Sequence, residues 1–114
     1  MADLLVDTDV FIDHLRGARG FDPQDHHVHY SVITRAELLA AATAAGAVNT
    51  LLSPFREIGV DRPIAERAGQ IRRETRVRLP DALIAATAIE GELTLVTRNR
   101  RDFARIRGLD LRTP

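Results

Sequence analysis

Short apolar segments alternate along this chain with longer segments that carry apolar residues at helical spacing. A short apolar run predicts a buried strand, whereas apolar residues three and four positions apart predict a helix. We predict strands over five segments: Leu4–Val6, His29–Val32, Arg56–Val60, Leu93–Thr97 and Leu109–Leu111. We predict helices after Asp9 and over Thr34 to about Ala45, Val48–Phe55, Arg62–Arg76 and Pro80–Ile89, with a short turn or helix over Asn99–Ala104.

Local signals set the ends of several of these helices. Asp9 and Asp61 are short polar residues of the kind that cap helix N-termini. Thr34 and Glu37 have the spacing of a capping box, and Gly91 is a typical helix stop. Strands separated mainly by helices predict an α/β fold, in which a central, mostly parallel β-sheet is flanked by helices on both faces.

The composition indicates one globular domain over residues 1–114. Apolar residues make up 45% of the chain, which is enough for a single core. No apolar run approaches the roughly 20 residues of a membrane span, and no basic stretch followed by an apolar run suggests a signal peptide. The sequence contains no cysteine, which excludes disulfides and thiolate chemistry and fits a cytoplasmic protein.

Charge is distributed unevenly although the formal net charge is zero. Residues 1–61 hold four arginines and nine acids, whereas residues 62–114 hold twelve arginines and seven acids. An acidic half and a basic half suit a metal site beside a phosphate-binding surface, and they equally suit a dimer or a partner that neutralises them. The chain contains no lysine, so lysine-assisted phosphoryl transfer is excluded.

Polar residues that are far apart in the sequence fall at equivalent ends of the predicted elements. Asp7 ends the first strand, Glu37 lies near the start of a helix, and Asp81 lies in the first turn of another. Asn99 and Asp102 follow a later strand. In a parallel sheet these places share one edge, so we expect the side chains to converge.

Each of these residues, taken alone, has an ordinary local role as a cap, a turn residue or a partner of a helix dipole. Together they would repel one another unless a cation neutralises them. Oxygen ligands suit Mg²⁺ or Mn²⁺, and such ions support phosphodiester hydrolysis.

Four segments, in this order, resemble the motifs of PIN-domain nucleases. They are Leu5–Asp13 (LVDTDVFID), Ser31–Leu39 (SVITRAELL), Leu79–Ile89 (LPDALIAATAI) and Leu93–Phe103 (LTLVTRNRRDF). The likeness is strongest to VapC-type toxins of bacterial toxin–antitoxin pairs. It implies a PIN fold, a Mg²⁺- or Mn²⁺-dependent endoribonuclease, a homodimer and a cognate VapB-type antitoxin that inhibits by placing a basic side chain among the acids.

The resemblance also implies roles for individual residues. Asp7, Glu37 and Asp81 match metal-binding acids of the family. Asn99 stands where the family has a fourth acid, and Asp102 lies one helical turn further on, so either residue could complete the site and the number of metal ions is open.

Two further residues, Asp9 and Thr97, match positions that would orient the ligands or a bound water.

Two other functions fit parts of the sequence. The segment Leu4–Val10 (LLVDTDV) also resembles the start of haloacid-dehalogenase-like phosphatases, in which the first aspartate is a nucleophile, but those enzymes need a lysine. A catalytically weak PIN-like domain that only binds RNA or protein would explain Asn99.

Basic residues outside the acidic positions give two more expectations. Arg98, Arg100 and Arg101, with Arg105 and Arg107, follow the last acidic motif and are expected to contact RNA phosphates or an antitoxin. His26, His27 and His29 are close in sequence and could bind Zn²⁺ or Ni²⁺, although solvated histidines are commoner.

Overall fold

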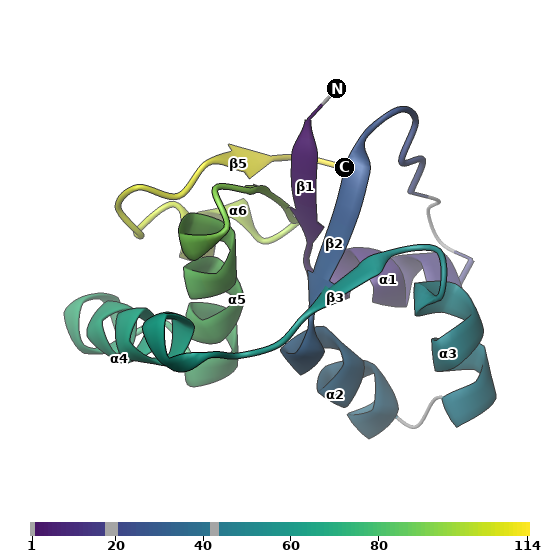
Figure 1. The fold of residues 1–114 in the computed structure, drawn as a ribbon, viewed down its shortest axis with the longest axis horizontal. Coiled ribbons are helices and arrows are strands. Elements are labelled where there is room, and N and C mark those ends of the chain that lie inside the picture. Colours follow the sequence, from purple (N-terminus) through teal and green to yellow (C-terminus); the bar gives the residue numbers. More distant parts are fainter. Residues whose placement is uncertain (1, 18–20, 42–43) are drawn as a thin grey trace.

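The computed structural model of the chain describes residues 2–17, 21–41 and 44–114. It consists of short parallel strands connected by helices (Figure 1). The strands are β1 (Asp3–Val6), β2 (His27–Ser31), β3 (Arg56–Ile58), β4 (Thr94–Val96) and β5 (Leu111–Arg112). The helices are α1 (Thr8–Leu15), α2 (Val32–Ala40), α3 (Ala45–Leu52), α4 (Arg62–Thr75), α5 (Leu79–Glu90) and α6 (Arg100–Phe103).

The five strands form one sheet in the order β3-β2-β1-β4-β5, and every pairing is parallel. The chain builds the sheet outward from β1 through β2 to β3, and then returns to add β4 and β5 on the other side. The direction of growth therefore reverses between β1 and β4. The predicted α/β fold with a parallel sheet is confirmed.

Helices cover both faces of the sheet, as predicted, because alternate strand residues point to opposite sides. Leu4 and Val6 of β1 are buried in a core with residues of α1, α2 and α3. Leu5 points the other way and is buried in a core with residues of α4 and α5. No helix in the described parts of the chain is both long and apolar enough to cross a membrane.

Two predicted helix caps are wrong. Asp7, rather than Asp9, caps α1, because β1 leads directly into the helix and the Asp7 side chain accepts the backbone N–H of Thr8. Ser31, rather than Thr34, caps α2, and its hydroxyl accepts the N–H of Ile33. Since α2 begins at once after β2, Thr34 lies inside the helix and Glu37 is not part of a capping box.

Several element bounds also differ from the sequence predictions. The helix predicted to run from Thr34 to about Ala45 ends at Ala40, and a separate helix begins at Ala45; residues 42–43 lie outside the described residues. The first residues of β2 precede the predicted start, whereas β3, β4 and β5 are shorter than predicted. The Asp61 cap of α4 is confirmed by its hydrogen bond from the N–H of Ile64.

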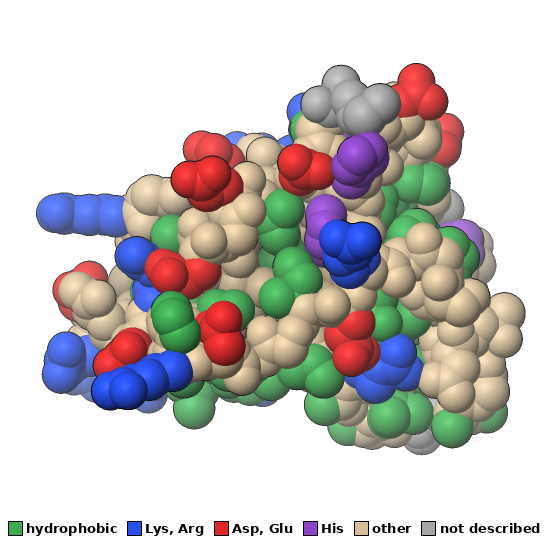
Figure 2. Space-filling view, in the orientation of Figure 1, with side chains coloured by type: hydrophobic (Ala, Val, Ile, Leu, Met, Phe, Trp, Pro, Cys, Tyr) green, Lys and Arg blue, Asp and Glu red, His purple; other side chains and the backbone are tan. Residues whose placement is uncertain are grey.

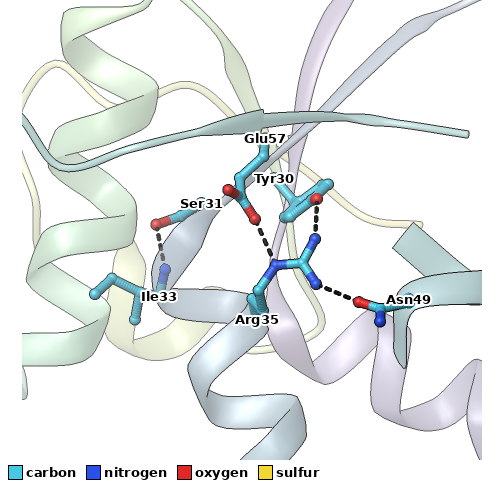
Figure 3. A network of polar contacts seen from close by, with 6 residues as sticks. All are labelled: Tyr30, Ser31, Ile33, Arg35, Asn49 and Glu57. Atoms are coloured by element: carbon cyan, nitrogen blue, oxygen red, sulfur yellow. Dashed lines mark hydrogen bonds and ion pairs between the residues drawn. The ribbon is translucent and has the colours of Figure 1, made fainter. Parts of the chain in front are cut away.

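Arg35 connects α2 to three other elements through hydrogen bonds (Figure 3). Its Nε lies 2.6 Å from Glu57 Oε1 on β3, its Nη1 donates to Asn49 Oδ1 on α3 at 2.8 Å, and its Nη2 donates to the Tyr30 hydroxyl on β2 at 2.9 Å. A guanidinium group has five donors in a rigid plane, so one side chain can serve all three acceptors. This network holds the side of α2 that faces α3 and β3.

Candidate functional site: an acidic cluster at the carboxyl end of the sheet

The strand order brings the predicted acids to one end of the sheet. Asp7 follows β1 and Thr97 follows β4, and these two strands are paired in parallel. Glu37 lies on α2, which follows β2, and Asp81 lies in the first turn of α5. Ligands of open parallel sheets bind beyond the carboxyl ends of the strands, where the order of growth reverses. Here that place lies between β1 and β4.

Neighbouring carboxylates at this end raise the pKa values of two acids, Asp7 and Asp81. Burial raises the pKa of Asp7, and the charges of Asp9 and Asp81 raise it further. Burial also raises the pKa of Asp81, and other carboxylates add to this effect, namely those of Glu37, Asp102 and Asp9. We call these five residues the acidic cluster. Its members come from α1, α2, α5, α6 and the end of β1, so the predicted convergence is observed.

Asp7 is the most deeply buried member of the acidic cluster, with only 5% of its surface exposed. Its Oδ1 accepts the N–H of Thr8 and its Oδ2 accepts the hydroxyl of Thr97, both at 2.8 Å. These two hydrogen bonds favour the charged carboxylate. Burial and the charge of Asp9 outweigh them, so the pKa of Asp7 rises from 3.8 to about 7.

Asp9 contacts the segment that follows β4, the segment that also contains Thr97. Its Oδ2 accepts the backbone N–H of Arg98 at 3.2 Å and lies 3.4 Å from the hydroxyl oxygen of Thr97. That hydroxyl has one proton, and the shorter distance assigns it to Asp7. Burial raises the pKa of Asp9. The charge of Arg98 opposes this rise. Among the described residues, Asp9 Oδ1 is buried without a hydrogen-bond partner.

Glu37 is contacted by a residue that the sequence analysis did not single out. Its Oε1 lies 2.7 Å from the hydroxyl oxygen of Thr8, which is also 2.9 Å from the hydroxyl oxygen of Thr34. Thr8 and Thr34 are both buried. The only sequence signal for Thr8 is that it immediately follows Asp7. Thr34, which was expected to cap a helix, contributes to this site instead.

Asn99 and Asp102 form a pair. The Asn99 side-chain amide donates to Asp102 Oδ2 at 3.1 Å, and the Asn99 backbone N–H donates to the hydroxyl of Thr97 at 3.0 Å. The charge of Asp102 adds to that of Glu37 in raising the pKa of Asp81, and Asn99 contacts Asp102. The structure therefore brings together both residues that the sequence left as alternatives.

The predicted RNA-contacting arginines divide into two groups. The Arg98 side chain is only 20% exposed and its Nε lies 2.5 Å from Asp13 Oδ2 on α1, so its guanidinium is engaged within the fold. Arg100 and Arg101 are exposed on α6, next to Asp102. On the face shown in Figure 2, other basic side chains gather at the left, where α4 lies.

His26 and His27 lie at the end of the sheet opposite the acidic cluster, and His29 lies in the middle of β2. The backbone N–H of Ala2 donates to Nδ1 of His26, and Nδ1 of His27 lies 3.3 Å from Asp3. Nδ1 of His29 lies 3.2 Å from a backbone carbonyl oxygen of β1. In Figure 2 histidine side chains lie beside acidic and basic groups. These contacts link the start of β2 to β1.

The donor atoms of the acidic cluster fit Mg²⁺ or Mn²⁺. All of them are carboxylate oxygens, which hard cations prefer. Within residues 2–17, 21–41 and 44–114, no three acidic or histidine side chains are placed to enclose an ion by themselves. Mg²⁺ commonly uses one or two carboxylates and retains several waters. Asp7 and Asp9 would supply such carboxylates, and the charge of Asp81 also acts on Asp7.

Comparison with known proteins identifies the class that this fold and site define. A model of the PIN domain matches residues 4–109, and the chain belongs to the PIN-domain family. Ribonuclease VapC10 of Mycobacterium tuberculosis is 39% identical over 109 residues, which cover 84% of this chain and 82% of that protein.

Solved structures agree with this membership. A toxin–antitoxin complex from Klebsiella pneumoniae contains a chain with 34% identity and a TM-score of 0.78, and the match covers 97% of both chains. DNA-bound VapBC from Salmonella typhimurium contains one with 28% identity and a TM-score of 0.80, covering 99% of this chain and 98% of that one. Membership in this family removes the phosphatase alternative.

Proposed function

We propose that this protein is a metal-dependent endoribonuclease and the toxin of a type II toxin–antitoxin pair, which hydrolyses RNA in the cytoplasm and thereby inhibits translation and growth. One observation carries the proposal: Asp7 is buried between the charges of Asp9 and Asp81 at the reversal point of the sheet. The relative named as a ribonuclease supports RNA as the substrate. Residues 1–114 act as a single domain in this proposal.

The proposed roles follow from the contacts of each residue. Asp7, Glu37 and Asp81 act together on Mg²⁺ or Mn²⁺, some of them through waters that the ion would retain, and Asp102, oriented by Asn99, adds a fourth charge. A divalent cation at this place would neutralise the carboxylates and stabilise the negative charge that develops on the phosphodiester under attack.

Two more residues keep these ligands in place. Thr97 holds the Asp7 carboxylate through its hydroxyl. Asp9 provides a second carboxylate beside Asp7, and the backbone N–H of Arg98 holds this carboxylate in place. The exposed Arg100 and Arg101, next to Asp102, would contact RNA phosphates.

The test is cleavage of total RNA by the purified protein in Mg²⁺, in Mn²⁺ and in EDTA. We expect discrete cuts that require the metal and that are lost in Asp7→Asn, which keeps the shape of the side chain but removes its charge. Asp110→Asn is the matched control, because Asp110 is exposed and lies outside the acidic cluster. Equal cleavage by the wild type and Asp7→Asn, or cleavage that persists in EDTA, would refute the proposal.

An apolar groove beside the acidic cluster suits the antitoxin. It has a volume of about 330 Å³ and lies between α2 and α5, lined by Ile33, Ala36, Glu37, Ala40, Leu79, Pro80 and Leu83. Leu79 is 50% exposed there. A VapB-type segment with apolar side chains for the groove and a basic side chain for Glu37 and Asp81 would complement both surfaces. The structural relatives include toxin–antitoxin complexes.

We also propose a homodimer, which would bring acidic and basic halves of two copies into contact. Light scattering on the purified chain measures this directly. A mass of one chain at micromolar concentration would contradict it.

A second candidate function is a domain that binds RNA or protein without cutting. Asn99, which stands where the family resemblance implies an acid, favours it because an amide adds no charge. Calorimetric titration with Mn²⁺ separates the two candidates. A metal-dependent nuclease should bind Mn²⁺ saturably, and Asp7→Asn should abolish this binding. A binding-only domain should show no such saturable binding.

A further inference from the structure

Thr8 contacts two members of the acidic cluster at once. It is the first residue of α1 and only 6% exposed. Its backbone N–H donates to Asp7 Oδ1 at 2.8 Å, and its hydroxyl oxygen lies 2.7 Å from Glu37 Oε1. Asp7 lies at the end of β1 and Glu37 lies on α2, so Thr8 connects these two elements directly.

The hydrogen-bond directions around Thr8 follow from the number of protons. A carboxylate only accepts, so the single hydroxyl proton of Thr8 is donated to Glu37. The hydroxyl of Thr34, 2.9 Å from that of Thr8, must then act as the donor to Thr8. The result is a directed chain from Thr34 through Thr8 to Glu37. Hydrogen bonds in such chains polarise and strengthen one another.

We propose that Thr8 is a positioning residue that holds the Glu37 carboxylate in the geometry needed for the cation, an inference that rests on the proposed metal-binding role of Glu37. A glutamate side chain has three rotatable bonds and is partly exposed here, so it samples many orientations unless a neighbour restrains it. Thr8 is suited to this task because a β-branched side chain is stiff and because its backbone is already fixed by Asp7.

Arg35 provides a control for the simpler view that Thr8 only attaches α2 to the rest of the fold. Arg35 lies on the same helix and also makes polar contacts with other elements: a half-buried one with Tyr30 and exposed ones with Glu57 and Asn49 (Figure 3). None of these three residues belongs to the acidic cluster. Removing the Arg35 contacts therefore weakens the attachment of α2 without removing a hydrogen bond to Glu37.

The experiment compares wild type, Thr8→Val, Thr8→Ser, Arg35→Met and Glu37→Gln. For each, Mn²⁺ affinity is measured by calorimetry, thermal unfolding is followed in EDTA, and RNA cleavage is measured with and without Mn²⁺. Valine keeps the shape of threonine but lacks the hydroxyl. We expect Thr8→Val to weaken Mn²⁺ binding on the order of 10-fold, the usual effect of losing a group that orients a metal ligand. Serine retains the hydroxyl, so Thr8→Ser should bind Mn²⁺ nearly as the wild type does.

Arg35→Met should unfold at a lower temperature but bind Mn²⁺ like the wild type. In a Glu37→Gln background, Thr8→Val should have little additional effect, because the two residues act through one contact. If Thr8→Val fails to fold because Thr34 loses its acceptor, the double variant Thr8→Val with Thr34→Val replaces it, since it leaves neither hydroxyl unpaired.

The outcomes separate this inference from the proposed function. If Glu37→Gln weakens Mn²⁺ binding but Thr8→Val does not, or if Arg35→Met weakens it as much as Thr8→Val does, the positioning role of Thr8 is overturned. If the wild type binds no Mn²⁺, or Glu37→Gln binds it unchanged, the metal-binding role of Glu37 fails, and the inference fails with it.

Discussion

The perturbed pKa of Asp7 makes the stability of the metal-free protein depend on pH. The pKa rises from 3.8 to about 7 on folding, because burial and the charge of Asp9 disfavour the carboxylate form. Between these two values the folded protein holds a proton that the unfolded chain has released. The free energy of unfolding therefore falls as pH rises, and the contribution is lost as pH passes through the folded pKa.

The magnitude follows from the size of this shift. One pKa unit corresponds to about 1.4 kcal/mol, and about two units of the shift lie between pH 5 and pH 7. Asp7 alone should then lower the free energy of unfolding by about 3 kcal/mol between pH 5 and pH 8. Asp9 and Asp81, whose pKa values are also raised, add to the decrease in the same direction. The variant Asp7→Asn removes only the contribution of Asp7 to this decrease in the free energy of unfolding.

The assay is urea unfolding in EDTA at pH 5 and pH 8, on the wild type, Asp7→Asn and the control Asp110→Asn. We expect the free energy of unfolding of the control to fall between pH 5 and pH 8 as that of the wild type does. For Asp7→Asn the decrease should be smaller by about 3 kcal/mol. Mg²⁺ at about 100 times its dissociation constant should restore roughly 2.7 kcal/mol to the wild type at pH 8 but not to Asp7→Asn. The same pH dependence in Asp7→Asn and the wild type would refute the reasoning.

Three other predictions concern the surroundings of the cluster. Thr97→Val removes the hydrogen bond that opposes the shift of Asp7, so the pKa of Asp7, followed by carboxyl NMR titration, should rise above about 7; an unchanged value would contradict the proton assignment. Arg100→Ala combined with Arg101→Ala should make RNA binding weaker and reduce its salt dependence by about one to two phosphate contacts, whereas an unchanged slope in a salt titration would exclude these arginines from the RNA surface. Leu79→Asp should weaken antitoxin binding, measured by calorimetry, while RNA cleavage persists; undiminished binding would place the antitoxin elsewhere.

Much of the fold was predictable from the sequence because it depends on near neighbours along the chain. Hydrophobic spacing identified every strand and most helices, and the cap at Asp61 is set by residues three positions apart. The rule that parallel strands share a carboxyl edge predicts from the sequence that Asp7, Glu37 and Asp81 lie together. The metal-binding roles of these residues stay predictions until the experiments above are done.

Local patterns failed where two elements meet without a loop. Thr34 and Glu37 have the spacing of a capping box, but β2 runs directly into α2, so Ser31 takes the cap. A sequence pattern records which residues could cap a helix. It does not record where the preceding strand ends, because strand pairing with a distant segment sets that end.

The contacts between side chains within the site depend on tertiary structure. Thr97 reaches Asp7 across 90 positions, and Thr8 reaches Glu37 across 29, so neither contact leaves a periodic signal. The internal ion pair of Arg98 has the same origin, since Asp13 lies on a different element. Local sequence patterns set which elements form and which acids share an edge. Only the packing of those elements decided which hydroxyl holds each acid and how strongly burial raises its pKa, because both depend on distances between residues that are remote along the chain.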